Sequence, residues 1–187
     1  MDWDHEDQLH RLDRGGGGAV YLAYDAAGQR VRRVHRKSAN DVEETIYVSG
    51  FEVRRRYGAG GHVDSARTTH HVTLGGRRFA LVETDLVRNG SQVTSPSRLV
   101  RYQIGNHLGS ACLELDATAR VLSYEEYYPY GATSYQAVDG QLDAPKRMRF
   151  NGKECDESGL YYYGARHYAP WLMRWMSCDP AGVSAGG

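Results

Sequence analysis

The amino-acid sequence predicts a mainly β protein, built from antiparallel strands and hairpins with little or no helix. Its 187 residues include 14 tyrosines against three phenylalanines, and 22 glycines against five prolines. Tyrosine favours strands that have one wet face, and glycine favours the tight turns that join strands. In addition, no long stretch of the chain keeps the 3.6-residue period of an amphipathic helix. Together these three observations predict many short strands.

The first strands are predicted around a turn that an aspartate starts. Val20–Tyr24 is rich in β-branched and aromatic residues, Asp25 starts a turn that a glycine closes, and Gln29–Val34 can return as the next strand. The same order of turn and strand recurs at Asp116, where an alanine replaces the glycine, and at Asp156. We interpret these segments as a degenerate repeat.

The clearest hairpin is predicted at the Gly-Gly pair of positions 75 and 76, because a two-residue glycine loop suits the primed turns of hairpins. In the register that this loop imposes, Val72 lies opposite Phe79 and His70 faces Leu81. We expect this side of the hairpin to be the buried one. The hairpin strands and the other strands are predicted at Thr69–Leu74, Arg77–Glu83, Thr45–Val48, Phe51–Arg55, Leu99–Ile104, Ala111–Leu115, Val121–Tyr128 and Arg147–Phe150.

Two later segments are not predicted as strands. Ser134–Pro145 reads as a polar loop. Trp171–Met176 can form one helical turn at most, because Pro170 and Pro180 bracket it.

Composition excludes several classes of function. The 23 basic residues balance 23 acidic ones, so the overall charge favours neither nucleic acid nor an anionic membrane as partner. Cys112, Cys155 and Cys178 are far apart, so we expect no zinc site, redox motif or disulfide framework. The N-terminus is acidic and has no apolar run behind it, so no signal peptide is predicted and the localisation stays undetermined. No apolar stretch approaches the length of a membrane helix.

Several blocks of the sequence resemble the Rhs/YD-repeat proteins and their repeat-associated core domain. The block at Tyr24–Arg30 is similar to the Tyr-Asp repeat itself. The blocks that resemble the core domain are Asn106–Ser110, Tyr124–Gly131, Phe150–Glu154, Gly159–Arg166 and Pro170–Gly182. Their order and spacing match as well. The resemblance implies degenerate YD-repeat strands over residues 1–98 and a truncated core domain over residues 99–187, as one continuous β structure.

The resemblance implies a function as well as a fold. Members of this family, including Tc-toxin C subunits and polymorphic toxins, wind a β-sheet into a hollow shell around a C-terminal toxin. In many of them an aspartyl protease at the end of the core cuts the chain between shell and toxin. Asp179 matches the first acid of that protease and Arg174 a basic residue of the preceding block. The sequence ends before the second acidic motif, so we expect no autoproteolysis, and both residues are interpreted as vestigial.

Three positions depart from the family pattern. Met173 stands where glycine is usual, Cys155 where arginine is usual and His167 where tyrosine is usual. We interpret these departures as drift in a remnant that no longer acts alone.

Ordinary structural roles are also the expectation for the other conspicuous residues. His70 and His71 point to opposite faces of a strand, so with His62 they do not form a metal site. The arginines at 54–56 and 77–78 are too few for a nucleic-acid patch, and the glycines at 15–18 lack the lysine of a phosphate loop. We expect the tyrosines at 161–163 and 168 to pack between strands, with a sugar-stacking role as the alternative. No cofactor is predicted.

The prediction from sequence is therefore a structural shell segment of a polymorphic toxin, not an enzyme. Its expected partners are other YD-repeat segments and an enclosed toxin domain. The alternatives are a truncated aspartyl autoprotease at Asp179 and a module that binds glycans or cell surfaces. The sequence leaves open the identity of any toxin, the secretion route, the oligomeric state, and whether the chain is a functional protein or part of a broken gene.

Overall fold

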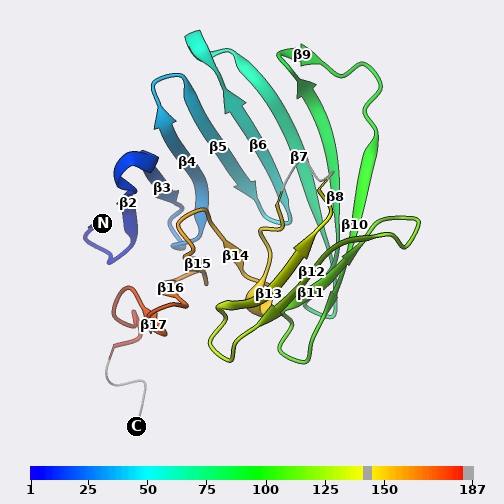
Figure 1. The fold of residues 1–187 in the computed structure, drawn as a ribbon. Coiled ribbons are helices and arrows are strands. Elements are labelled where there is room, and N and C mark those ends of the chain that lie inside the picture. The colour runs from blue at the N-terminus through cyan, green and yellow to red at the C-terminus, as the bar shows by residue number, and fades with distance from the viewer. Residues whose placement is uncertain (141–144, 183–187) are drawn as a thin grey trace. The chain divides into compact units, whose positions relative to one another are not determined.

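The computed structural model describes residues 1–140 and 145–182, and it is built from β-strands (Figure 1). The strands are β1 (Asp2–Trp3), β2 (Leu9–Asp13), β3 (Ala19–Tyr24), β4 (Arg30–Ser38), β5 (Asp41–Val48), β6 (Phe51–Tyr57), β7 (Val63–Leu74), β8 (Arg77–Arg88), β9 (Ser91–Gln92), β10 (Arg98–Gly105), β11 (Ala111–Leu115), β12 (Val121–Tyr127), β13 (Thr133–Val138), β14 (Glu154–Cys155), β15 (Tyr161–Tyr162), β16 (His167–Ala169) and β17 (Arg174–Trp175). Three short 3-10 turns, η1 (Gly15–Gly17), η2 (Ala59–Gly61) and η3 (Phe150–Gly152), accompany them. The predicted fold class is confirmed. Within the described residues, no helix is long and apolar enough to cross a membrane.

The chain divides into two compact units. Unit 1 comprises Met1–Val72 and Leu81–Leu99, and unit 2 comprises Thr73–Ala80 and the chain from Val100 onward.

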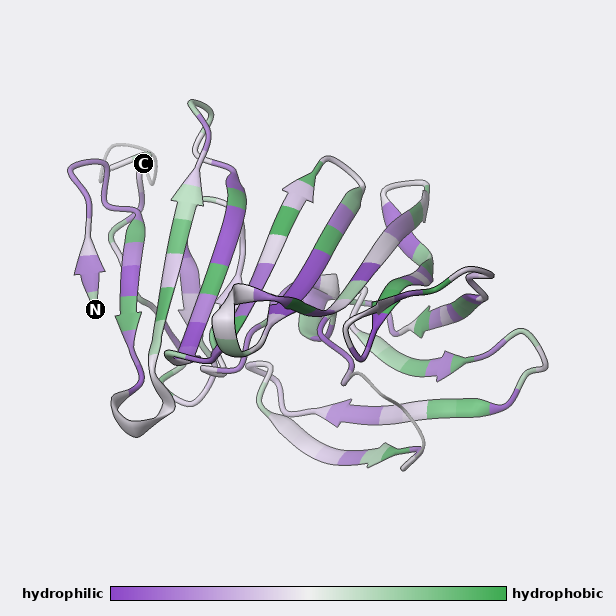
Figure 2. Ribbon diagram, turned by 90° about the horizontal axis from the view of Figure 1, so that it is seen from above, coloured by the Kyte–Doolittle hydropathy of each residue, from purple (hydrophilic) through white to green (hydrophobic). Residues whose placement is uncertain are grey.

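Unit 1 is an antiparallel meander in which each strand from β2 to β8 pairs with the strand before it in the sequence. Its apolar residues are concentrated in β2 and β3, where Leu9, Leu12, Val20 and Leu22 are buried. In β4 to β6 most of the buried side chains are polar or charged instead. Figure 2 shows the resulting pattern, with hydrophilic and hydrophobic bands alternating along the strands.

One five-residue loop geometry recurs between strands throughout the described chain. The N–H of the first residue donates to the C=O of the fifth, and the N–H of the fourth residue donates to the C=O of the first. In every such loop but the one that begins at Arg14, the fourth residue lies in the left-handed region, with φ between +57° and +87°. The loops begin at Asp4, Arg14, Asp25, Gly58, Asn106, Asp116, Tyr128, Arg149 and Asp156.

Side chains of Asp and Asn explain why five of these loops form where they do. In the loop that begins at Asp25, Oδ1 accepts the N–H groups of Ala27 and Gln29, both at 2.9 Å. The fourth residue, Gly28, has φ of +73°, a conformation that glycine adopts without strain. Ala119 occupies the same place in the Asp116 loop with φ of +64°. The repeat predicted from Asp25, Asp116 and Asp156 is confirmed as a shared turn, and Asp4 and Asn106 extend it.

The β7–β8 hairpin forms at the predicted glycine pair, but near the turn the predicted buried side is wrong. His70, Val72 and Phe79 are exposed, whereas Leu81 and Glu83, farther along that side of β8, are buried. On the opposite sides of the two strands, Thr69 and Ala80 are buried. The apolar pattern misled the prediction because this sheet buries polar side chains as readily as apolar ones.

Unit 2 contains the β10–β13 meander and a small antiparallel sheet of β14 to β17. A cluster of Phe150, Cys155 and Tyr161 forms an apolar centre, against which Tyr127, Tyr163 and Tyr168 pack. The Tyr127 and Tyr161 rings lie 5.8 and 6.1 Å from the Phe150 ring, tilted or edge-on, as aromatic pairs prefer.

Three predictions in unit 2 need correction. Arg147–Phe150 is not a strand: Met148 forms a single bridge to Glu154, and the chain then turns at η3. Ser134–Pro145 is not simply a loop, because β13 occupies its first part, while residues 141–144 lie outside the described residues. Trp171–Met176 forms turns and β17 rather than a helical turn.

Met173 has φ of +53°, in the left-handed region. Glycine adopts this backbone conformation without strain, in keeping with the glycine that the family resemblance implies at this position.

Candidate functional site

Asp179 and Arg174, the two residues that match the family's protease, do not form an ion pair with each other. Asp179 forms an ion pair of 2.7 Å with Arg166, and its Oδ1 accepts the N–H of Ala181 at 3.0 Å. The N–H of Gly182 donates to its backbone carbonyl at 2.9 Å, which completes a turn. Arg174 is exposed in β17, opposite Ala169. The cation that meets Asp179 is thus Arg166, which is also stacked over the Trp175 ring at 4.3 Å.

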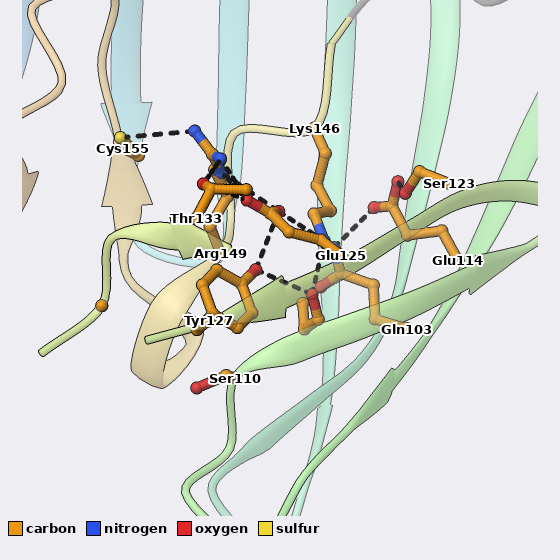
Figure 3. A network of polar contacts seen from close by, with 12 residues as sticks. Gln103, Ser110, Glu114, Ser123, Glu125, Tyr127, Thr133, Lys146, Arg149 and Cys155 are labelled. Carbon is orange, nitrogen blue, oxygen red and sulfur yellow. Dashed lines mark hydrogen bonds and ion pairs between the residues drawn. The ribbon is translucent and has the colours of Figure 1, made fainter. Parts of the chain in front are cut away.

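The most concentrated group of charged side chains in unit 2 surrounds Glu125 of β12 (Figure 3). The Glu125 side chain is 0% exposed. Lys146 Nζ lies 2.9 Å from its Oε2, and Arg149 Nε donates to both carboxylate oxygens at 2.9 and 3.1 Å. Arg149 Nη2 also binds Oε1. Thr133 Oγ1 donates to Oε1 at 2.8 Å, and the Tyr127 hydroxyl lies 2.9 Å from Oε2. Two cations and two hydroxyls therefore saturate one carboxylate.

A second buried carboxylate, Glu114 of β11, lies beside the first on the same sheet (Figure 3). Its side chain is 0% exposed, and Arg101 Nη2 lies 2.6 Å from its Oε2. Gln103 Nε2 donates to Oε1 and Ser123 Oγ donates to Oε2, both at 2.8 Å. Cross-strand register explains this set, since Gln103 and Ser123 stand directly opposite Glu114 on the two neighbouring strands.

The side chains around Glu125 come from two parts of unit 2. Glu125 and Thr133 belong to β12 and β13, whereas Lys146 and Arg149 belong to the segment that leads to β14. Arg149 starts the loop that contains η3, in which the N–H of Asn151 donates to Ser110 Oγ at 3.0 Å. The ion pairs therefore join the small sheet to the β10–β13 meander.

Electrostatics hold the Glu125 group in its charged form. Burial alone would raise the pKa of Glu125, but the hydrogen bonds and charges of Arg149 and Lys146 outweigh it, so the pKa lies below its usual value. Burial would lower the pKa of Arg149, and the hydrogen bond to Glu125 raises it above the usual value. Burial together with the Glu125 charge raises the pKa of Tyr127. A permanently ionised carboxylate with filled acceptor sites is unsuited to proton transfer near neutral pH.

Cys155 borders this network without being activated by it. Its thiol is buried, and burial raises its pKa to about 11, although Arg149 Nη1 lies 3.8 Å from the sulfur. A thiol that is neutral at pH 7 is a weak nucleophile. The network therefore has the properties of a structural ion-pair network and not those of a catalytic site.

Unit 1 contains a more exposed set of ion pairs on β4 to β6. Glu43 contacts Lys37 and Arg54 at 2.7 and 2.9 Å, and these cations are 35% and 27% exposed. Glu44 contacts Arg32 at 2.7 Å and accepts the Tyr57 hydroxyl at 2.7 Å. The arginines at 54–56, which the sequence analysis excluded as a nucleic-acid patch, all lie within ion-pair distance of acids.

Three of the histidines and tyrosines considered in the sequence, His70, His71 and Tyr161, contact neighbouring segments of the chain. His70 packs on the Phe51 ring at 4.5 Å, whereas the adjacent His71 places Nε2 2.8 Å from Glu52 Oε1. Tyr161 is 1% exposed and donates to the carbonyl of Gly131 at 3.2 Å. Its burial removes it from any aromatic platform for sugars.

Glu125 and Glu114 were not singled out by sequence analysis. Both alternate with apolar or aromatic residues along their strands, and this pattern predicts that the acidic side chains face solvent. The usable signal is the presence of Lys146 and Arg149 ahead of an aromatic block, but only the fold brings them to Glu125.

A sequential antiparallel meander with recurring turns, several of them started by Asp or Asn, defines the class: this is an extended, repetitive β-sheet protein. No protein-family model matches the chain. Toxin subunit YenC1 of Yersinia entomophaga is 38% identical over 167 residues, which cover 87% of this chain and 17% of that protein. Toxin subunit YenC2 of the same organism is 35% identical over 167 residues, with the same shares covered.

Solved structures agree with these relatives. A TcdB2–TccC3 crystal structure matches 97% of this chain with a TM-score of 0.82 and 32% identity, over 9% of that chain. The Tc holotoxin pore of Photorhabdus luminescens matches 97% of this chain with a TM-score of 0.82 and 31% identity, again over 9%. The chain belongs to the Rhs/YD-repeat family and is similar to a segment of Tc-toxin C subunits. It spans about a sixth of the length of the curated relatives that it matches.

Proposed function

We propose that the chain forms a stretch of wall in a Tc-toxin-like shell that encloses a toxin payload, and that it performs no catalysis itself. The observation that carries this proposal is the match of nearly the whole chain to one segment of TcdB2–TccC3 structures. A wall segment needs a continuous hydrogen-bonded ladder and fixed connections between its sheets.

The buried network supports the wall role. Glu125 and Glu114 lie where water is excluded, and each meets cations and neutral donors that fill its oxygens. Buried carboxylates of an acid–base enzyme need one group with a pKa near the working pH. The pKa of Glu125 is shifted in the opposite direction, which favours a structural role for the network.

The wall role is tested by exchanging the matched segment of TccC3 for this chain. One of the solved TcdB2–TccC3 complexes was determined without the hypervariable C-terminal region. We expect the chimera to assemble with TcdB2 and to protect that C-terminal region from added protease to the same extent as unaltered TccC3 measured in parallel. A chimera that folds and assembles but leaves the region open to digestion would contradict the proposal.

The autoprotease alternative is tested by the intact mass of the purified chain. We expect a single species at 20.9 kDa after prolonged incubation. Cleavage that Asp179→Asn abolishes would establish the alternative instead. Asp116→Asn is the matched control, since Asp116 starts a similar turn with the N–H of Thr118 at 2.8 Å.

The glycan-binding alternative concerns the same tyrosines that pack between strands. Tyr168 donates its hydroxyl to the carbonyl of Tyr130 at 3.1 Å, and its ring lies 6.1 Å from that of Tyr163. We expect no saturable binding on a glycan array. Binding that Tyr163→Ala removes, while the fold is retained, would favour the alternative.

A further inference from the structure

Strand β13 is an unusual end strand. It is the last strand on the path of its sheet, and its hydrogen-bonded neighbour there is β12. All of its six residues, Thr133–Val138, are exposed. The segment reads Thr-Ser-Tyr-Gln-Ala-Val, without charge, proline or glycine. Such a segment has the features that promote pairing with another strand.

The other end strands of the described sheets lack these features. β1, β9, β14 and β17 contain two residues each, and three of them include a charged residue: Asp2, Glu154 and Arg174. Short length and charge are common protections of a sheet edge. Among the described end strands, β13 is therefore the one suited to accept a further strand.

The two acidic residues next to β13 each have a polar partner. Asp139, which follows the strand, lies 2.7 Å from Arg120. Glu126 opposes Tyr135 on β12 and accepts a hydrogen bond from Tyr124 at 2.8 Å. The Asp139 charge is thus paired, whereas the exposed Glu126 carboxylate keeps its charge on β12, one strand away from the open edge of β13.

We propose that β13 pairs antiparallel with β13 of a second copy of this chain, to form a symmetric dimer. Two copies of one strand are self-complementary in this arrangement, because a two-fold axis relates the donors of one to the acceptors of the other. Like charges would oppose each other across such an axis, and β13 has none. A two-fold axis at the middle of the strand brings the exposed Tyr135 rings of both copies close together. This inference goes beyond the proposed wall role and does not rest on it.

Sedimentation equilibrium of the full chain across a wide concentration range tests the proposal. We expect a reversible equilibrium between the 20.9 kDa monomer and a species of twice that mass, with no larger assemblies, since β13 is used up in the dimer. Hydrogen exchange at high concentration should slow at amides of β13 relative to the dilute protein. A chain that stays monomeric throughout, or one that forms open-ended assemblies, would overturn the proposal.

Tyr135→Lys is the variant that should break the dimer. It places a like charge in both copies near the two-fold axis, and we expect about a tenfold or larger increase in the dissociation constant. Tyr130→Lys is the matched control, because Tyr130 is similarly exposed, at 58% against 55%, but lies in a loop. Circular dichroism verifies the fold of each variant.

Ala137→Lys provides a second test if Tyr135→Lys fails to fold. Ala137 is exposed on β13, so lysine there removes no buried contact. Its matched control is Ala117→Lys in the exposed turn before β12. If both control variants weaken the dimer as much as the β13 variants, another surface mediates association and the proposal is wrong.

Discussion

The two units use the same pair of chemical groups, a glutamate and its cations, at very different depths. In unit 1 the partners of Glu43 keep 35% and 27% of their side-chain surface exposed. In unit 2 Glu125 and Lys146 are both 0% exposed. Water can replace a lost partner in the first case but not in the second. Ion pairs of similar distance therefore differ in what their loss costs the fold.

The largest effect is expected from Glu125→Ala. It leaves Lys146 and Arg149 without their carboxylate, and breaking a buried ion pair typically costs about 3–5 kcal/mol of the free energy of unfolding. Urea unfolding followed by tryptophan fluorescence measures the loss. Glu126→Ala is the matched control, since this neighbour contacts the exposed Tyr124 hydroxyl, and its loss should stay under about 1 kcal/mol. Equal losses in both variants would show that the network does not stabilise the fold.

Replacement of the glycine in the Asp25 loop is expected to have the next largest effect. Gly28 has φ of +73°, and an added Cβ would lie 2.9 Å from Gln8 Nε2. We expect Gly28→Ala to lower the free energy of unfolding by about 1–2 kcal/mol. The converse change Ala119→Gly, at φ of +64°, should raise it by about 0.5–1 kcal/mol. Thermal unfolding of the pair measures both signs, and a destabilised Ala119→Gly would contradict this account.

Glu43→Ala should cost about 1 kcal/mol, and the loss should depend on salt. Its cations are partly exposed, so concentrated salt already screens their attraction to Glu43. In 1 M sodium chloride we expect the difference from wild type to shrink markedly, whereas the cost of Glu125→Ala should stay nearly constant. Urea unfolding at low and high salt makes this comparison. Identical salt dependence in both variants would remove the contrast between the units.

The smallest expected effect at neutral pH is that of Glu43→Gln, whose clearest signature lies in acid. The Lys37 and Arg54 groups outweigh the effect of burial and hold the pKa of Glu43 at about 2, against 4.5 in the unfolded chain. The stability that this group contributes is therefore present above about pH 4.5 and is lost as the pH falls toward 2. The stability difference between wild type and Glu43→Gln should shrink over this range. A difference that is independent of pH would exclude the assignment.

Local patterns in the sequence predicted the strands and turns well, because a turn that Asp25 starts and Gly28 closes needs few distant partners. The buried side of the β7–β8 hairpin was predicted wrongly near its turn, since apolar alternation assumes an apolar core. The role of Glu125 was missed for the same reason. Its two cations, Lys146 and Arg149, are more than twenty positions away in the sequence, and no local pattern encodes how the fold brings them to Glu125.

The order of strands in each meander has a consequence for how such a protein can change in length. Every strand from β2 to β8 pairs with its immediate predecessor, and β11 to β13 do the same within unit 2. The gain or loss of an even number of strands would re-route no existing connection. Each strand can also pair as soon as it is synthesised, because its partner strand precedes it in the sequence. Growth of the sheet and its folding can therefore proceed in the same direction along the chain.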